Sequence, residues 1–162
     1  MPTEDPHYLE RFVTAQSSAY HLALAELKAG RKRTHWMWFI FPLARGLGRT
    51  STSEFFGIAS LEEARAYLAH PVLGHRLWAC TAAALEVETP SLNALFGSPD
   101  DLKFVSSMSL FQLAAGDPDP FQKALDRWNG GRIDPRTAEL MGHSPELTGR
   151  AGLLRVPSWT PR

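Results

Sequence analysis

Four predicted helices start where proline follows a residue whose side chain can accept a hydrogen bond: Asp5-Pro6, Ser98-Pro99, Asp119-Pro120 and Asp134-Pro135. An acceptor at the N-cap and proline at the first helical position both favour the start of an α-helix, because the N–H that proline lacks has no partner there. The run Ser60-Leu61-Glu62-Glu63 adds a capping box. These local signals predict a chain built from helices.

Apolar residues recur at helical spacing between these starts. The stretch from Pro6 to Ala29 is predicted to form one long amphipathic helix. Further helices are predicted over residues 61–69, 71–87, 91–96, 99–115, 120–129 and 135–141. Helices are expected to end in the left-handed conformation at Gly30, Gly97, Gly116 and Gly142. No segment alternates with period two for long enough to predict a sheet.

Residues 35–41 are the ambiguous segment, since their composition also suits a buried strand, but the helical context favours a short buried helix capped by Thr34. We therefore predict an all-α fold: a single compact domain of about seven helices over residues 5–142. An irregular or flexible tail is predicted over residues 143–162, where Ser, Pro, Gly and Arg are frequent.

Charge and apolar content exclude several classes of protein. Seventeen basic residues balance seventeen acidic ones, so we expect neither nucleic acid nor an anionic membrane as a partner. The N-terminus lacks a signal-peptide pattern, and no apolar stretch approaches the roughly 20 residues that cross a bilayer; we expect a soluble cytoplasmic protein. The single cysteine, Cys80, allows no internal disulfide, and no metal site or cofactor is predicted.

The segment Arg31–Pro42 joins a basic triplet to the densest aromatic run in the chain. The side chains of His35, Trp36 and Trp38 each need a polar partner when buried. They either find that partner inside the core or line a pocket for a ligand. With Arg45 and Arg49, the triplet is the best local candidate for a basic site.

The following turn, Arg45–Thr50, contains Gly46 and Gly48 between the two arginines Arg45 and Arg49. The glycines could let consecutive N–H groups converge on an anion, with the arginines adding charge. The alternative is an ordinary turn, because Gly-x-Gly is common in turns.

A third group of residues lies on one predicted helix, where Lys103 and Ser107 are separated by one turn and Asp100 precedes Lys103 by three residues. Lys103 and Ser107 could hold a carboxylate or phosphate. The alternative is an ion pair between Asp100 and Lys103 at the helix start, with Ser107 as a small packing residue.

Several segments together resemble, in order, the domain of unknown function family 1810. They are His35–Pro42, Arg45–Thr50, Ser53, Ile58, Tyr67–Leu77, Phe96–Lys103 and Ser106–Phe111. The resemblance covers residues 5 to about 141 and implies a mainly α-helical fold without an established activity. The sequence departs from the family at Leu43, where glutamine is usual, and at Thr50, where serine is usual.

Standard catalytic signatures are absent from the sequence. Our leading hypothesis is a pocket for a small anionic ligand that is nucleotide-like or ADP-ribose-like, with Trp36 or Trp38 stacked on the base. Three side chains would hold its phosphate: Arg45, Arg49 and Lys103. If the chain is an enzyme, hydrolysis of an N-glycosidic bond with Glu54 or Asp100 as the carboxylate fits that ligand.

The rival hypothesis is a non-enzymatic helical module whose functional surface is a groove for a partner protein or a homodimer face. In that case the aromatic segment is core. The two hypotheses differ in geometry: the first predicts that His35, Trp36 and Trp38 border a concave site that Arg45 and Lys103 also reach.

Overall fold

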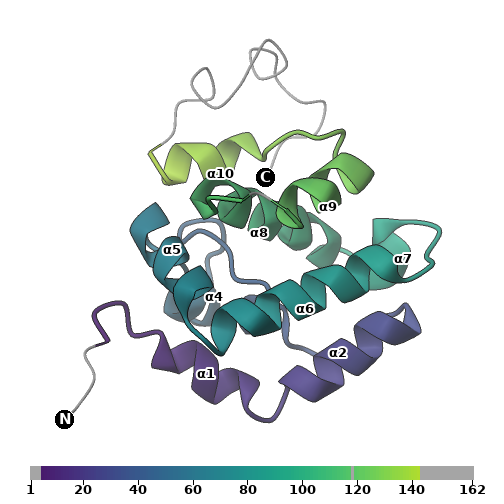
Figure 1. Ribbon diagram of the computed structural model, residues 1–162, viewed down its shortest axis with the longest axis horizontal. Helices are drawn as coiled ribbons and strands as arrows, with labels where there is room; N and C mark the ends of the chain where they lie inside the picture. Colours follow the sequence, from purple (N-terminus) through teal and green to yellow (C-terminus); the bar gives the residue numbers. More distant parts are fainter. Residues whose placement is uncertain (1–4, 118, 143–162) are drawn as a thin grey trace.

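A computed structural model describes residues 5–117 and 119–142, and in this part of the chain it contains ten helices and no strand (Figure 1). The helices are α1 (Glu10–Gln16), α2 (Tyr20–Ala29), α3 (Met37–Ile40), α4 (Ser51–Phe56), α5 (Leu61–Ala69), α6 (Leu73–Glu86), α7 (Leu92–Phe96), α8 (Asp100–Ala114), α9 (Phe121–Trp128) and α10 (Pro135–Leu140). The all-α class is confirmed. Within the described residues, no helix is both long and apolar enough to cross a membrane.

The helix α8 forms the centre of the fold, with every residue from Phe104 to Phe111 buried. It packs against α5, α7, α9 and α10, while α6 pairs with α2 on the face nearest the viewer in Figure 1. Nine large buried side chains show the aromatic and aliphatic character of the core: Phe12, Leu27, Trp36, Phe41, Tyr67, Leu73, Leu77, Phe104 and Phe111. This single cluster joins residues from both halves of the chain.

The predicted helix starts are confirmed at two positions. The hydroxyl of Ser60 accepts a hydrogen bond from the Glu63 N–H, and the Asp134 carboxylate accepts one from the Arg136 N–H at the start of α10. The other three predictions are wrong. At Ser98 and Asp119 the proline itself occupies the N-cap, so each acceptor lies one residue too early to cap the helix. At Asp5 the helix begins only at Glu10, with Leu9 as its N-cap and no side-chain cap.

The first predicted helix is divided into α1 and α2 at Ser17–Ala19, and this is one reason that the count is ten and not seven. The hydroxyl of Ser17 donates to the Thr14 carbonyl, a local bond that competes with helix continuation. The side chain of Gln16 turns inward and donates to the Phe39 carbonyl and to the Tyr67 hydroxyl. The end of α1 therefore coincides with a buried polar side chain that is bonded to distant parts of the chain.

The remaining differences concern short elements. The sequence did not predict α4, whose N-cap Thr50 accepts from the Ser53 N–H. Helix α3 lies in the ambiguous segment, but Thr34 does not cap it, because the Thr34 hydroxyl donates to Glu26. Helix α8 ends at Ala114, and its C-cap is Ala115 in an extended conformation, not the expected Gly116. The predicted tail, residues 143–162, lies outside the described residues.

Candidate functional site

One buried carboxylate, that of Glu26 on α2, holds the segment that precedes α3. Its two oxygens accept four hydrogen bonds, from the N–H groups of Arg33 and Thr34, the Thr34 hydroxyl and the Trp36 indole N–H, at 2.8–3.1 Å. Burial alone would raise the pKa of Glu26, but these hydrogen bonds outweigh it and lower the pKa to about 2. The ionised Glu26 carboxylate thus holds the backbone of residues 33–36 in place.

The core interpretation holds for Trp36, which is 1% exposed. Its indole N–H is taken by Glu26, and its ring packs against those of Phe41 and Phe96. A ligand cannot stack on a ring that is covered in this way. Of the two candidate platforms, only Trp38 is partly exposed.

A cleft of about 200 Å³ lies between this anchored segment and the start of α8. We call it the lysine cleft, and its lining residues are Lys32, His35, Trp36, Met37, Trp38, Phe39, Thr52, Asp100 and Lys103. The structure thus brings together three predicted aromatic or imidazole side chains with Lys103 and Asp100, although they come from distant parts of the sequence.

Two lysines meet a single carboxylate in the lysine cleft. The Lys32 ammonium lies 2.8 Å from one oxygen of Asp100, and the Lys103 ammonium lies 3.3 Å from the other. The Lys32 side chain is 7% exposed and that of Lys103 is 25% exposed. Each ammonium also lies over an indole ring, Lys32 at 5.0 Å from the centroid of Trp36 and Lys103 at 4.3 Å from that of Trp38. The three charged groups leave a net charge of +1.

Lys32 was missing from the predicted site residues, although it belongs to the basic triplet that precedes the aromatic run. Its pairing with Asp100 joins two distant segments, and no local pattern carries that information. The predicted i, i+3 ion pair between Asp100 and Lys103 is present, so Lys103 has both a structural partner and an open cleft beside it.

The structure places Arg45 and Glu54 elsewhere. Both line a second cleft of about 410 Å³, which shares no lining residue with the lysine cleft. One Nη of Arg45 donates to the Gly57 carbonyl at 3.1 Å. Among the described residues, Arg45 and Lys103 therefore line different clefts, and these two clefts do not form one site. Arg49 is exposed.

The glycines of the Arg45–Thr50 turn allow close packing. A Cβ atom at Gly48 would lie 2.6 Å from the Ser53 Cβ and 2.9 Å from the Trp38 ring, so only glycine lets α4 and Trp38 approach in this way. Gly46 has a φ of +108° and lies against Leu140 of α10. Gly48 thus positions a wall of the lysine cleft.

Ser107 and Cys80 are buried side chains. The Ser107 hydroxyl has no hydrogen-bond partner among the described residues and does not line the lysine cleft. Burial raises the pKa of the Cys80 thiol to about 12, which suits an unreactive packing residue. Within residues 5–117 and 119–142, no group of three or more His, Cys, Asp or Glu side chains is arranged to hold a metal ion.

Comparison with known proteins gives one family and one solved structure. A family model described as "Protein of unknown function (DUF1810)" matches residues 6–141. The chain is also similar to the conserved hypothetical protein Rv1873 from Mycobacterium tuberculosis, known from a crystal structure. The two are 48% identical, with a TM-score of 0.84 over 86% of this chain and 100% of that one. A search of curated proteins finds no match.

Proposed function

Because the chain belongs to the DUF1810 family, whose description assigns no activity, we propose from the geometry alone that the lysine cleft binds a small anionic ligand, nucleotide-like or ADP-ribose-like. The observation that supports this most is the convergence of Lys32 and Lys103 on one carboxylate beside an open cavity. Two ammonium groups with one counter-ion attract an anion, and a phosphate oxygen can accept from both.

The size of the cleft limits how such a ligand fits. A cavity of about 200 Å³ is smaller than the 300–1,000 Å³ or so that usually encloses a drug-sized ligand. It holds a phosphate and its neighbouring group, so the rest of the ligand extends across the rim. There His35 is exposed and Trp38 is partly exposed. A base that stacks on Trp38 must share the indole with the Lys103 ammonium.

Of the two carboxylates considered for hydrolysis of an N-glycosidic bond, only that of Asp100 lines the lysine cleft. Asp100 lies in the lysine cleft and Glu54 in the second cleft. If the bound ligand is hydrolysed at an N-glycosidic bond, Asp100 is the residue that supports the positive charge developing on the sugar. Replacing Asp100 by asparagine then abolishes turnover while anion binding persists.

Thermal melting against inorganic phosphate, AMP, ADP, ADP-ribose and sugar phosphates tests the proposal. A ligand at about 100 times its dissociation constant stabilises the folded protein by roughly 2.7 kcal/mol. Lys103→Met removes the charge but keeps the apolar stem, so it should abolish the shift. Lys123→Met, on exposed α9 surface, is the matched control.

Two results would contradict this proposal. An unchanged shift in Lys103→Met would place the ligand elsewhere. No shift across the panel at millimolar concentration, with folding confirmed, would remove this class of ligand.

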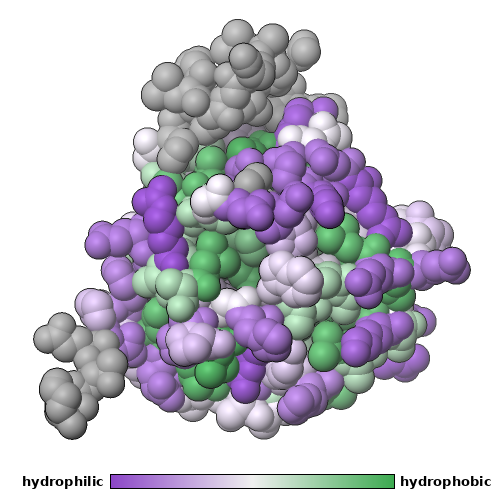
Figure 2. Space-filling view, viewed as in Figure 1, coloured by the Kyte–Doolittle hydropathy of each residue, from purple (hydrophilic) through white to green (hydrophobic). Residues whose placement is uncertain are grey.

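The alternative is a helical interaction module or homodimer, and it is supported by large apolar side chains at the surface. Within the described part of the chain six are exposed: Tyr8, Leu22, Phe55, Trp78, Leu102 and Leu140. Figure 2 shows hydrophobic residues reaching the surface between hydrophilic ones on the face that carries α6. Sedimentation at increasing concentration tests the homodimer, since Trp78→Ala should then lower the association constant.

A further inference from the structure

A buried guanidinium, that of Arg11, organises the second cleft. Its N–H groups donate to four carbonyl oxygens and one carboxylate, at 2.6–3.0 Å: those of His7, Tyr8, Phe55, Gly57 and Glu63. Two of these carbonyls belong to Tyr8 and Phe55, which come from the turn before α1 and from α4. One side chain therefore fixes the backbone at both residues.

Tyr8 and Phe55 present large aromatic rings to solvent. The two side chains are 56% and 47% exposed, and their rings make an edge-to-face contact with centroids 6.0 Å apart. Tyr8 also has a φ of +50°, in the left-handed region that favours glycine. The Tyr8 side chain is mostly exposed, so its burial does little to offset the strain of this backbone conformation. A strained, exposed aromatic residue of this kind is typical of a binding surface.

Charged groups surround this exposed pair without neutralising one another. Arg45 and Glu54 line the same cleft, and among residues 5–117 and 119–142 neither takes part in an ion pair. Their separate charges are available to a ligand. The buried Glu63, in contrast, is paired with Arg11 at 2.7 Å.

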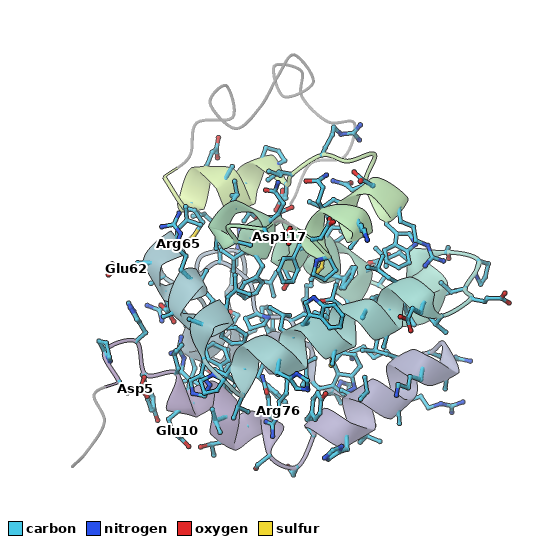
Figure 3. All side chains as sticks on the ribbon, viewed as in Figure 1. Asp5, Glu10, Glu62, Arg65, Arg76 and Asp117 are labelled. Atoms are coloured by element: carbon cyan, nitrogen blue, oxygen red, sulfur yellow. The ribbon has the colours of Figure 1, made fainter. Side chains whose placement is uncertain are left out.

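The cleft continues past Pro6 and His7, which it shares with an adjoining depression of about 580 Å³. The acidic residues of this depression are Asp5 and Glu10, and Figure 3 shows them close together at the start of α1. We call the two depressions together the Arg11 groove. Its Asp5 end is acidic, and its Arg45 end carries the carboxylate of Glu54 as well as the guanidinium of Arg45.

We propose that the Arg11 groove docks an extended peptide segment of a partner protein. An apolar side chain of the peptide packs on Tyr8 and Phe55, an acidic one meets Arg45, and a basic one lies toward Asp5 and Glu10. A peptide suits the groove better than a small molecule does, because the groove extends over two adjoining depressions and offers separate charges of both signs beside an exposed aromatic pair. Its acidic residues disfavour nucleic acid. This site is independent of the lysine cleft.

Fluorescence anisotropy with two labelled peptides, Lys-Lys-Ala-Phe-Glu-Glu and the reversed sequence, tests the proposal on the full chain. At least one orientation should bind saturably at up to millimolar concentration. Phe55→Ala should weaken that binding by about ten-fold, as expected for an aromatic anchor. Trp78→Ala, which removes an exposed aromatic ring on α6, should leave it unchanged.

Tyr8→Gly separates a binding role from a structural one. Glycine adopts the φ of +50° without strain, so this variant should melt at the wild-type temperature or higher while peptide affinity falls by about ten-fold. Arg45→Gln should abolish the preference for glutamate over glutamine in the peptide. Absence of saturation with both peptides, or wild-type affinity in Tyr8→Gly and Phe55→Ala, would overturn the proposal. A lower melting temperature in Tyr8→Gly with unchanged affinity would show that the ring is structural.

Discussion

Replacing Glu26 by glutamine tests whether a buried negative charge stabilises the segment that forms the lysine cleft. The shape of the side chain is retained and its charge is lost. The pKa of Glu26 is lowered from 4.5 to about 2, which corresponds to roughly 3 kcal/mol of stability when the carboxylate is ionised. Since glutamine keeps part of the hydrogen bonding, we expect Glu26→Gln to lower the free energy of unfolding by about 2 kcal/mol at neutral pH.

The pH dependence of this loss gives the sharper test. A pKa that is lowered in the folded state stabilises the fold fully above the ordinary value, and that stabilisation disappears as the pH falls from about 4.5 toward about 2. The difference between wild type and Glu26→Gln should therefore shrink over this range. Denaturant unfolding followed by tryptophan fluorescence at several pH values measures it, with the exposed Glu86→Gln on α6 as control.

If the difference in free energy of unfolding between wild type and Glu26→Gln stayed constant from neutral to acid pH, the charge of Glu26 would not be what stabilises the segment. The same would follow if Glu86→Gln reproduced the profile of Glu26→Gln. Glu26→Gln should also lower the affinity of any ligand that binds in the lysine cleft, since Glu26 accepts hydrogen bonds from the backbone N–H groups of Arg33 and Thr34.

Three further predictions concern single residues. Asp100→Asn raises the charge of the lysine cleft from +1 to +2, so calorimetry should find tighter, salt-sensitive binding of phosphate-bearing ligands, and weaker binding would contradict the assigned charge balance. Gly48→Ala should lower the free energy of unfolding by about 1–3 kcal/mol in denaturant titration, because a Cβ there meets Ser53 at 2.6 Å. Cys80 should resist a thiol reagent at mildly alkaline pH until the chain is unfolded, because burial raises its pKa to about 12.

The sequence predicted elements whose signals are local. Ser60 and Asp134 cap the helices that they were expected to cap, because a cap involves residues within one turn. The break after Gln16 was missed, because it is accompanied by contacts with Phe39 and Tyr67, which lie far along the chain.

The candidate site shows the same division. Lys103 and Asp100 are one helical turn apart and could be paired from spacing alone, whereas Lys32 reaches Asp100 only through the tertiary fold. The sequence likewise could not show that Arg45 and Lys103 line different clefts, because both are basic residues in segments that resemble the family. Their assignment to two clefts comes from the tertiary structure, in which the Lys103 ammonium lies over Trp38 and the Arg45 guanidinium donates to the Gly57 carbonyl.

The hydrogen bonds of Arg11 also have a consequence for the order in which the chain assembles. They join residue 11 to partners 44, 46 and 52 positions away, so the loop must close before the guanidinium can be satisfied. Contacts of such high sequence separation form late, after α4 and α5 have brought their carbonyl and carboxylate groups together. Helix α1 should accordingly be the last helix to pack onto the rest of the domain during folding. In native-state hydrogen exchange, its amides should exchange before those of α5 and α8 at the centre of the fold.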